Sequence, residues 1–231
     1  MSGHVGPNVV TDGLILCLDS FNHLSLQGDT WRDVSGSGVE GTISGPSSIY
    51  DGGKRFLDFT GGVGHVRLVR DDLNGGSFAY REATFEMWYR HRAGRTGITA
   101  NNILTIENTF EISCGDVGGG KAALNYASQP WSWRGRSKPV MPVEQWVQIT
   151  YVHRTTGRWI YVDGDEVFYS DNTGALSSGT SKYPYLTLMA RYTGTSSRTS
   201  GDISYVNIYN RPLEEVEIKH NYRALRDRFL G

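Results

Sequence analysis

The sequence is short of the features that mark several protein classes. Its longest apolar run, Leu14–Leu18, is far too short to cross a membrane. The start of the chain has no basic region followed by an apolar run, so no signal peptide is visible. Lysine and arginine (23) nearly balance aspartate and glutamate (24), and a net charge of −1 gives no general attraction to nucleic acid or an anionic membrane. We therefore expect neither nucleic acid nor a membrane as a partner.

The chain is also poor in residues that build metal and nucleophilic sites. Its two cysteines, Cys17 and Cys114, both fall within apparent strands, which predicts buried free thiols. The six histidines are scattered singly, and no phosphate-binding loop or nucleophile elbow occurs. A retaining glycoside hydrolase needs two carboxylates roughly 5 Å apart, but no run of acids alternates along one strand, and Glu86 stands alone. We expect a protein that is not an enzyme.

What the chain does contain is the pattern of an antiparallel β fold. The clearest stretch is Trp146–Tyr169, where apolar and polar residues alternate through three short segments. The last two segments are joined by Asp163-Gly164, a dipeptide that two-residue hairpin turns prefer because both positions need positive φ. This stretch predicts a three-stranded meander.

Similar segments recur every eight to twelve residues, a spacing typical of a β-sandwich. Strands are predicted over Gly13–Asp19, Val39–Ser44, Arg55–Phe59, His65–Val69, Ala83–Arg90, Ile103–Glu107, Phe110–Cys114, Ala122–Tyr126, Tyr185–Met189 and Gly201–Tyr209. The first of these is expected to be central in its sheet and the last to lie at or near an edge. Arg55–Phe59 and His65–Val69 should pair across Gly61-Gly62, and Phe21–Gly38 should be a loop.

The two ends of the chain differ from this pattern. Near the C-terminus, Ile218, Tyr222, Leu225 and Phe229 follow one another at spacings of 4, 3 and 4, which predicts a helix over residues 213–229 with one apolar face. Residues 1–12 are polar and contain glycine and proline, which indicates an extended arm. We therefore predict an arm over 1–12 and a single domain over 13–231 that includes the helix.

The most unusual chemistry lies in Ser128–Val143, which contains three prolines and should be an exposed or inter-sheet loop. Trp131, Trp133, Arg134 and Arg136 fall within it. Indole rings stack on sugars and guanidinium groups donate to hydroxyls or carboxylates, so these four residues are candidates for glycan binding. The same residue types dominate protein–protein hot spots, and tryptophans can also close the end of a sandwich. The sequence leaves all three interpretations open.

Four stretches in order carry a family resemblance: GLILCLD with WRDVSGSG, ATFEMWY, the meander with its VDG turn, and GDISYVNIYNRPLEEVEIKHNY. With them the chain resembles the laminin-G-like, concanavalin-A-like jelly-roll domains, particularly the stand-alone kind found among bacteriophage structural proteins. The resemblance implies an antiparallel jelly-roll β-sandwich with a closing helix. One departure is visible, because Glu214 stands where the family often has a Ser or Asp helix cap, which should weaken the cap by about 1 kcal/mol.

The resemblance does not fix the function, because one fold hosts many activities. Combined with the lack of a catalytic constellation, it favours a virion protein that decorates or cements a bacteriophage head or tail through contacts with capsid or tail proteins. A closed homo-oligomer fits such a role. The alternative is a carbohydrate-binding, lectin-like module with glycans as partners.

We expect no cofactor and no metal. The resemblance allows calcium, and loop acids are present at Asp29, Asp33, Asp71 and Asp72, but they lack the spacing of an EF-hand loop and solvated acids are the favoured interpretation.

Overall fold

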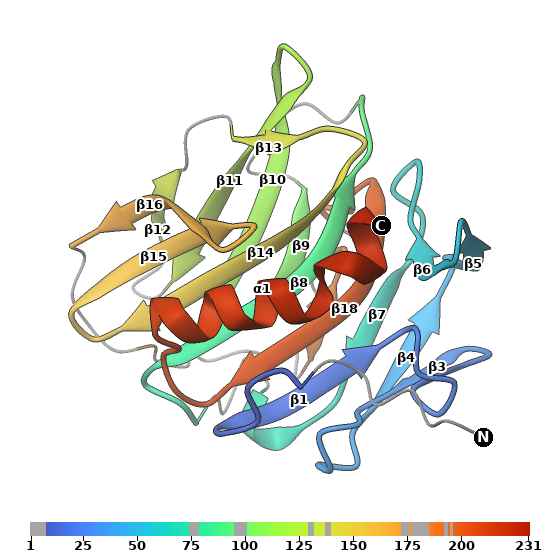
Figure 1. The fold of residues 1–231 in the computed structure, drawn as a ribbon, viewed down its shortest axis with the longest axis horizontal. Coiled ribbons are helices and arrows are strands. Elements are labelled where there is room, and N and C mark those ends of the chain that lie inside the picture. Colours follow the sequence, from blue (N-terminus) through green and yellow to red (C-terminus); the bar gives the residue numbers. More distant parts are fainter. Residues whose placement is uncertain are drawn as a thin grey trace.

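The computed structural model describes residues 8–73, 79–94, 101–128, 132–136, 140–171, 176, 185–191, 194 and 196–231, with residues 128 and 132–136 described by their backbone alone. Within these residues the chain forms two antiparallel sheets, a 3-10 turn (η1, Asp71–Leu73) and one α-helix (α1, Glu215–Leu230), as Figure 1 shows. The predicted all-β, antiparallel β-sandwich of concanavalin-A-like type with a C-terminal helix is confirmed.

In the described part of the chain, the first sheet has eight strands and the second has ten. The first runs in the order β16 (Asp165–Ser170), β15 (Gly157–Val162), β14 (Trp146–Arg154), β8 (Ala83–His91), β18 (Gly201–Tyr209), β6 (Lys54–Asp58) and β5 (Ser47–Asp51), with β1 (Leu14–Asp19) paired to β18. The second runs in the order β12 (Ser132–Arg136), β11 (Lys121–Ser128), β10 (Phe110–Gly118), β9 (Asn102–Ile106), β17 (Leu186–Leu188), β7 (His65–Leu68), β4 (Glu40–Ser44), β3 (Thr30–Arg32) and β2 (Leu26–Gln27), with β13 (Met141–Pro142) paired to β11.

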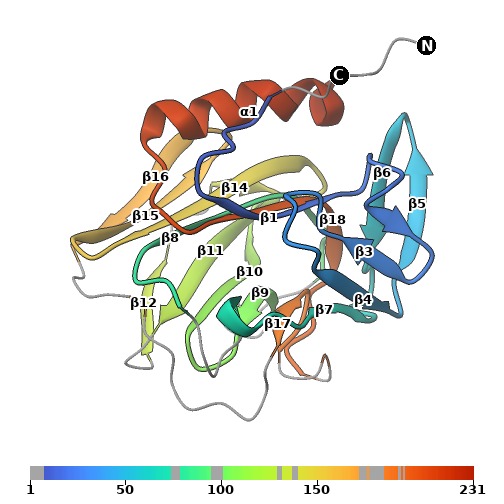
Figure 2. The same ribbon diagram turned by 90° about the horizontal axis from the view of Figure 1, so that it is seen from below.

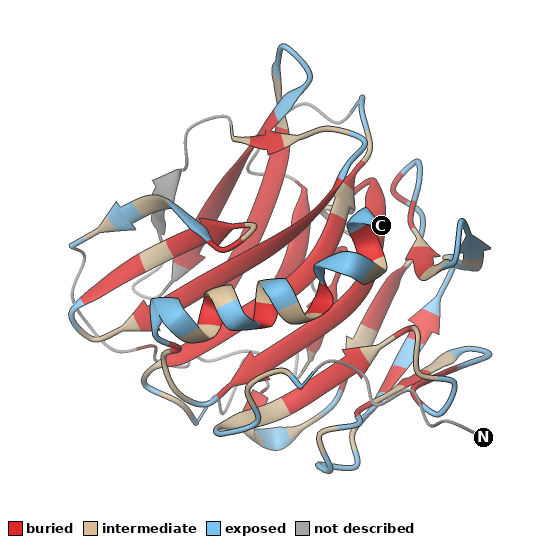
Figure 3. Cartoon of the chain, in the orientation of Figure 1, coloured by how far each residue is buried: buried red, intermediate tan, exposed pale blue. Residues whose placement is uncertain are grey.

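The inner faces of the two sheets meet in an aromatic core. Phe85 and Tyr151 of the first sheet pack against Phe110 of the second, with ring centroids 4.7 and 4.4 Å from that of Phe110. Contacts at these separations stabilise a core beyond the burial of apolar area alone. Most positions of the central strands are buried, as Figure 3 shows. Cys17 and Cys114 are buried free thiols, which confirms that prediction.

The predicted meander is present as β14, β15 and β16. Asp163 and Gly164 have φ angles of 55° and 84°, so both residues of the turn take the left-handed conformation that the Asp-Gly dipeptide suggests. The remaining predicted strands also form, with ends that differ from the expected ones by at most four residues. Local alternation and turn chemistry were sufficient to find them.

The predicted places of several strands in the sheets were wrong. β1 pairs with β18 alone among the described strands, whereas β18 has partners on both sides and all nine of its residues are buried. β6 and β7 do not form a hairpin, because β6 belongs to the first sheet and β7 to the second. The Gly61-Gly62 segment therefore crosses between the sheets. Period-2 patterns identify strands but not their non-local partners.

Two segments predicted to be loops contain strands. Phe21–Gly38 contains β2 and β3, and the proline-rich stretch Ser128–Val143 contains β12 and β13. β12 is the edge strand of the second sheet and lies between the prolines, so it needs no ladder hydrogen bond from a proline nitrogen. The expectation of an exposed loop at 132–136 is corrected to an edge strand. β5, Ser47–Asp51, was not predicted.

Helix α1 crosses the outer face of the first sheet, as the turned view in Figure 2 shows. Three of the four predicted apolar positions, Ile218, Leu225 and Phe229, are buried. The Phe229 ring stacks on Trp88 of β8 with centroids 4.2 Å apart. The expected weakness of the Glu214 cap is partly offset, because its backbone N–H donates to the Glu217 carboxylate at 2.8 Å.

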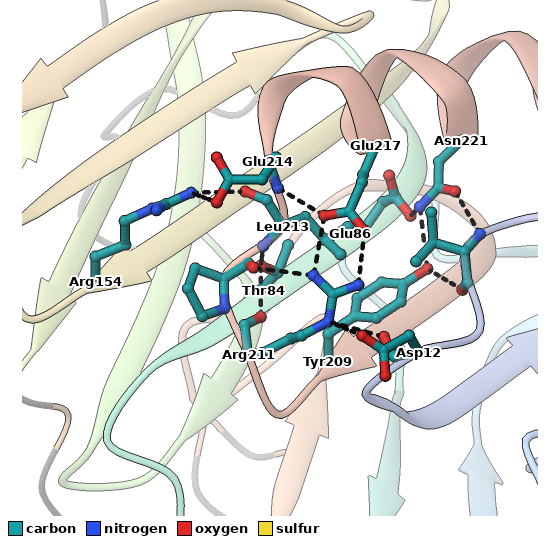
Figure 4. Close-up of polar contacts among 12 residues, drawn as sticks. Asp12, Thr84, Glu86, Arg154, Tyr209, Arg211, Leu213, Glu214, Glu217 and Asn221 are labelled. Atoms are coloured by element: carbon teal, nitrogen blue, oxygen red, sulfur yellow. Dashed lines mark hydrogen bonds and ion pairs between the residues drawn. The ribbon is translucent and has the colours of Figure 1, made fainter.

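A buried polar network joins the helix to the sheet and to residues 8–12 (Figure 4). Glu86 of β8 accepts from Gln148 at 2.8 Å and from Asn221 of the helix at 3.0 Å. Asn221 also accepts from the backbone N–H of Val10 at 2.8 Å, and the Tyr209 hydroxyl donates to the Val10 carbonyl at 3.1 Å. Residues 8–12, in the region predicted as an arm, are thereby held against α1 and β18.

Candidate functional site

Three of the four residues singled out in the sequence belong to the edge strand of the second sheet. Trp131 is outside the described residues. Trp133, Arg134 and Arg136 belong to β12, which is described by its backbone. In register, Trp133 is opposite Ala127, Arg136 is opposite Asn125, and a register irregularity lies between these pairs. The predicted role of these four residues in binding stays a prediction. The strand β12 extends a sheet whose outer face carries other polar groups.

This face is the outer side of the second sheet, the side turned away from the core. Along β10, Phe110, Ile112 and Cys114 belong to the core cluster, so the alternate residues Glu111 and Ser113 point outward. Residues directly opposite one another on paired strands share a face. The register therefore builds a row across the sheet: Trp133, Ala127, Glu111, Thr105, Thr187, Arg67 and Thr42. Five of these seven positions hold polar or charged residues.

Two glutamates on this face converge on one arginine. Arg191 Nε lies 2.5 Å from Glu111 Oε1, and its guanidinium contacts the Glu107 carboxylate at 3.5 Å. Glu111 is fully buried, and this burial, opposed by Arg191, raises the pKa of its carboxyl group to about 7. Burial likewise raises the pKa of Glu107. The guanidinium is thus fixed in position by two carboxylates that are themselves poorly solvated.

The face changes from buried to accessible along the row. Glu111, Ser113 and Thr105 have at most 1% of their surface exposed, whereas Arg67 of β7 and Tyr185, next to β17, are half-buried. The Arg67 guanidinium lies over the Tyr185 ring, 5.1 Å from its centroid. Arg67 is ~14 Å from Glu111, three strand spacings away. A ligand would therefore meet an aromatic ring and an arginine first, at β7 and β17.

Buried polar atoms without a hydrogen-bond partner gather on this face and at its rim. They are Asn102 Oδ1, Glu107 Oε2, Thr109 Oγ1, both Glu111 oxygens, Ser113 Oγ and both His65 ring nitrogens. Glu111 Oε1 nonetheless lies in close charge contact with Arg191. Since an unpaired buried polar atom costs about 1–3 kcal/mol, such a concentration is typical of a surface that meets water or a ligand.

Sequence reasoning missed Glu107, Glu111, Arg191 and Tyr185. A signal was present, because β9, β10 and β17 each place a polar residue between apolar neighbours: Thr105, Glu111 and Thr187. Only the register shows that these three share one face. Glu86, the carboxylate that the sequence brought forward, lies under α1 on the other sheet.

A second constellation, between the two sheets, has the order of a nucleophilic triad. His91 Nε2 lies 2.8 Å from Asp116 Oδ1, and Cys114 Sγ lies 3.3 Å from His91 Nδ1. The cysteine is fully buried, and burial raises the pKa of its thiol to about 12 while it lowers the pKa of His91. A nucleophilic cysteine needs a depressed pKa and access, so this thiol is inert.

The loop acids considered for calcium are engaged within the chain where the structure shows their partners. The Asp33 carboxylate accepts from the backbone of Cys17 at 2.6 Å and from the Ser35 and Ser37 hydroxyls at 2.8 and 2.7 Å. Asp72 accepts from Arg70 at 2.7 Å. Among the described residues, no three His, Cys, Asp or Glu side chains gather to hold a metal ion. No helix in this part of the chain is long and apolar enough to span a membrane.

Comparison with solved structures finds the same fold in proteins of low sequence identity. Domain 4 of the extracellular GH43 arabinanase AbnA from Geobacillus stearothermophilus, in complex with arabinotriose, is 18% identical with a TM-score of 0.66, covering 90% of this chain and 98% of that one. The binding domain of botulinum neurotoxin DC in complex with rat synaptotagmin II is 15% identical with a TM-score of 0.66, covering 94% and 52%. The sialidase of Trypanosoma rangeli in complex with 2,3-difluorosialic acid is 17% identical with a TM-score of 0.67, covering 100% and 36%.

No curated protein matches the chain. The chain spans about half of the toxin binding domain and about a third of the sialidase. A family model described as the concanavalin A-like lectin/glucanases superfamily matches residues 60–219, which include all the strands that form the polar face except β4. The chain belongs to this superfamily, in its laminin-G-like branch.

Proposed function

We propose that the chain is a non-enzymatic carbohydrate-binding domain whose ligand contacts the outer face of the second sheet at β7 and β17. The observation that carries the proposal is Arg191, held by two buried carboxylates at the polar row whose accessible end bears Tyr185. A fixed guanidinium offers several donors in a rigid plane, and a half-buried ring offers an apolar face. Sugars present hydroxyl groups around an apolar ring face, which both groups complement.

The arrangement supports binding rather than catalysis. A glycoside hydrolase uses one carboxyl group as an acid and the other as a base or nucleophile, and both must reach the substrate. Here Glu111 has no exposed surface and both Glu107 and Glu111 are paired with Arg191. Their role in the proposal is to position the arginine.

The comparisons with solved structures support a sugar ligand, but only through the shared fold. The arabinanase domain, which spans nearly the same length as this chain, is in complex with arabinotriose, and the sialidase is in complex with a sialic acid derivative. These two ligands are bound by the arabinanase domain and the sialidase. For this chain they indicate that oligosaccharides are the class of compound to test first.

A glycan array tests the proposal. The wild-type protein should bind at least one oligosaccharide class, and Tyr185→Ala should weaken that binding about tenfold, because ring contacts contribute on the order of 1 kcal/mol. Tyr50→Ala is the matched control, since Tyr50 is 76% exposed on β5 of the other sheet and should leave binding unchanged. Trp133→Ala and Arg136→Ala show whether the edge strand takes part. Binding to no glycan, or an unchanged Tyr185→Ala variant, would contradict the proposal.

The predicted place of the protein on a bacteriophage head or tail, with virion proteins as partners, stays a prediction. It is compatible with glycan binding if the domain recognises a host surface. Measurement of its copy number in purified particles tests it: a fixed stoichiometric number supports a virion component, and absence from particles contradicts it.

A further inference from the structure

His65 occupies an unusual position on the polar face. It lies on β7, two residues before Arg67, and therefore points to the same outer side. It is 7% exposed, and neither of its ring nitrogens has a hydrogen-bond partner. Gly194 packs directly against the imidazole, and a Cβ built there would lie 2.0 Å from Nδ1. The ring is thus held in place while both of its polar atoms stay unused.

The charges of the described residues that act on His65 are both positive. Arg67 and Arg198 both act on it and, together with burial, lower the pKa of its imidazole. Arg198 Nε donates to the Gly194 carbonyl at 2.8 Å, so this exposed arginine is tied to the residue that covers the ring. Among the described residues, neither Arg67 nor Arg198 forms an ion pair with a carboxylate, in contrast to Arg191 with its two glutamates. In the part of the chain that the structure describes, the cluster has three basic groups and no neutralising acid.

Such a cluster fits a negatively charged ligand. An anion would accept from the two guanidinium groups, supply the missing partner for a His65 nitrogen, and relieve the repulsion between the cations. The contact between Arg67 and the Tyr185 ring already orients one guanidinium, which reduces the entropy that binding must overcome.

We propose that His65, Arg67 and Arg198 form the anion subsite of the glycan-binding face and take the carboxylate or sulfate group of an acidic sugar. The inference rests on the proposed function and narrows its ligand class from glycans in general to acidic glycans. The two ends of the face then differ in the groups of the sugar that they contact. Arg191, already neutralised, contacts uncharged hydroxyls, while the unneutralised end at β7 selects for charge.

Calorimetry with three matched probes tests the subsite: an oligogalacturonate for carboxylate, a sulfated dextran oligosaccharide for sulfate, and the uncharged dextran oligosaccharide as reference. At least one acidic probe should bind about tenfold or more tighter than the neutral one. Arg67→Gln and Arg198→Gln should each remove most of that preference. Arg223→Gln deletes one charge from an exposed position of α1 on the other sheet and should leave the preference intact.

An NMR titration gives a readout without mutation. Binding of the acidic probe should raise the pKa of the His65 imidazole, and binding should strengthen as pH falls through that pKa. If neutral and acidic sugars bind equally and the arginine variants behave like wild type, the subsite is refuted while the glycan-binding function stands. If no sugar of either kind binds and the His65 resonances do not move, both are refuted. Preference for the carboxylate or for the sulfate probe decides which anion the subsite takes.

Discussion

Each sheet has one fully buried glutamate on its outer side, Glu86 on the first sheet and Glu111 on the second. The two are equally buried and both have a raised pKa, but they contact different groups. Burial raises the pKa of Glu86 and that of Glu111 to about 7. Among the described residues, Glu86 accepts from neutral amide and hydroxyl groups, which come from β14, β18 and α1. Glu111 meets a cation, Arg191, on a face where many polar atoms lack a partner.

The difference indicates that burial and a raised pKa do not by themselves mark a functional site. The Glu86 network ties together three parts of the chain that are distant in sequence, β8, α1 and residues 8–12, and ends inside the protein. The Glu111 face continues along one sheet to side chains that solvent reaches. We therefore assign a structural role to the Glu86 network and propose a binding role for the Glu111 face.

Removal of the apolar contact that presses α1 on the sheet should have the largest effect on stability. Phe229 stacks on Trp88 and also contacts Trp146 and Phe21, with centroids 5.3 and 5.5 Å away. Phe229→Ala should lower the free energy of unfolding by about 3–5 kcal/mol, measured by chemical denaturation. Glycan binding by the remaining folded protein should be unchanged. Loss of binding in a folded variant would show that the helix contact at Phe229 and the outer face of the second sheet are coupled.

The Glu86 carboxylate should make stability depend on pH. Its pKa is near the ordinary 4.5 in the unfolded chain and about 7 in the folded one, so the folded state holds the extra proton between these values. Stability should therefore fall as pH rises from about 4.5 to 7 and stay low above, by up to about 3 kcal/mol from this group.

Glu86→Gln should flatten that part of the stability curve and unfold at a higher denaturant concentration than wild type at pH 8. The new amide can be accommodated because Gln148 Oε1 has no partner, so a rotated Gln148 amide can accept from it. Denaturation of both proteins at pH 5 and pH 8 measures the effect. An equal dependence on pH in the two proteins would show that Glu86 does not titrate in this range.

A conservative change at Arg191, on the outer face of the second sheet, should weaken binding and leave the fold nearly intact. Arg191→Lys keeps a positive charge beside Glu107 and Glu111 but loses the planar fork of donors. Affinity for the glycan should fall about tenfold, equivalent to about 1.4 kcal/mol, while the melting temperature changes by a few degrees at most. Unchanged affinity would remove Arg191 from the site.

The smallest effect is expected at an exposed ion pair near the Glu86 network. Asp12 lies 2.8 Å from Arg211, but its side chain is 85% exposed, so water screens the pair. Asp12→Asn should cost less than about 0.5 kcal/mol by the same denaturation assay. A loss several times larger would show that residues 8–12 depend on this pair rather than on the buried bonds of Asn221.

The sequence alone predicted those parts of the fold whose signals are local. The meander follows from alternation and the Asp163-Gly164 turn, and the helix follows from a 3.6-residue period. The positions of β1 and β18 in their sheet and the partner of β6 were mispredicted, because pairing between distant strands leaves no mark in either strand alone. The candidate site was missed for the same reason, since Glu111 and Arg191 are 80 residues apart in sequence. Trp133 was singled out by composition, and only the register connects it to that face.

Chemical-shift mapping of the backbone amides during titration with an oligosaccharide tests whether the outer face of the second sheet is the binding surface. We expect the shifted resonances to cluster on β7, β9 and β17, at Arg67, Thr105 and Thr187. The chemical shifts of the amides of α1 and β8 around Glu86 should not change. Shifts confined to α1, or to the β15–β16 hairpin at the far edge of the first sheet, would contradict it.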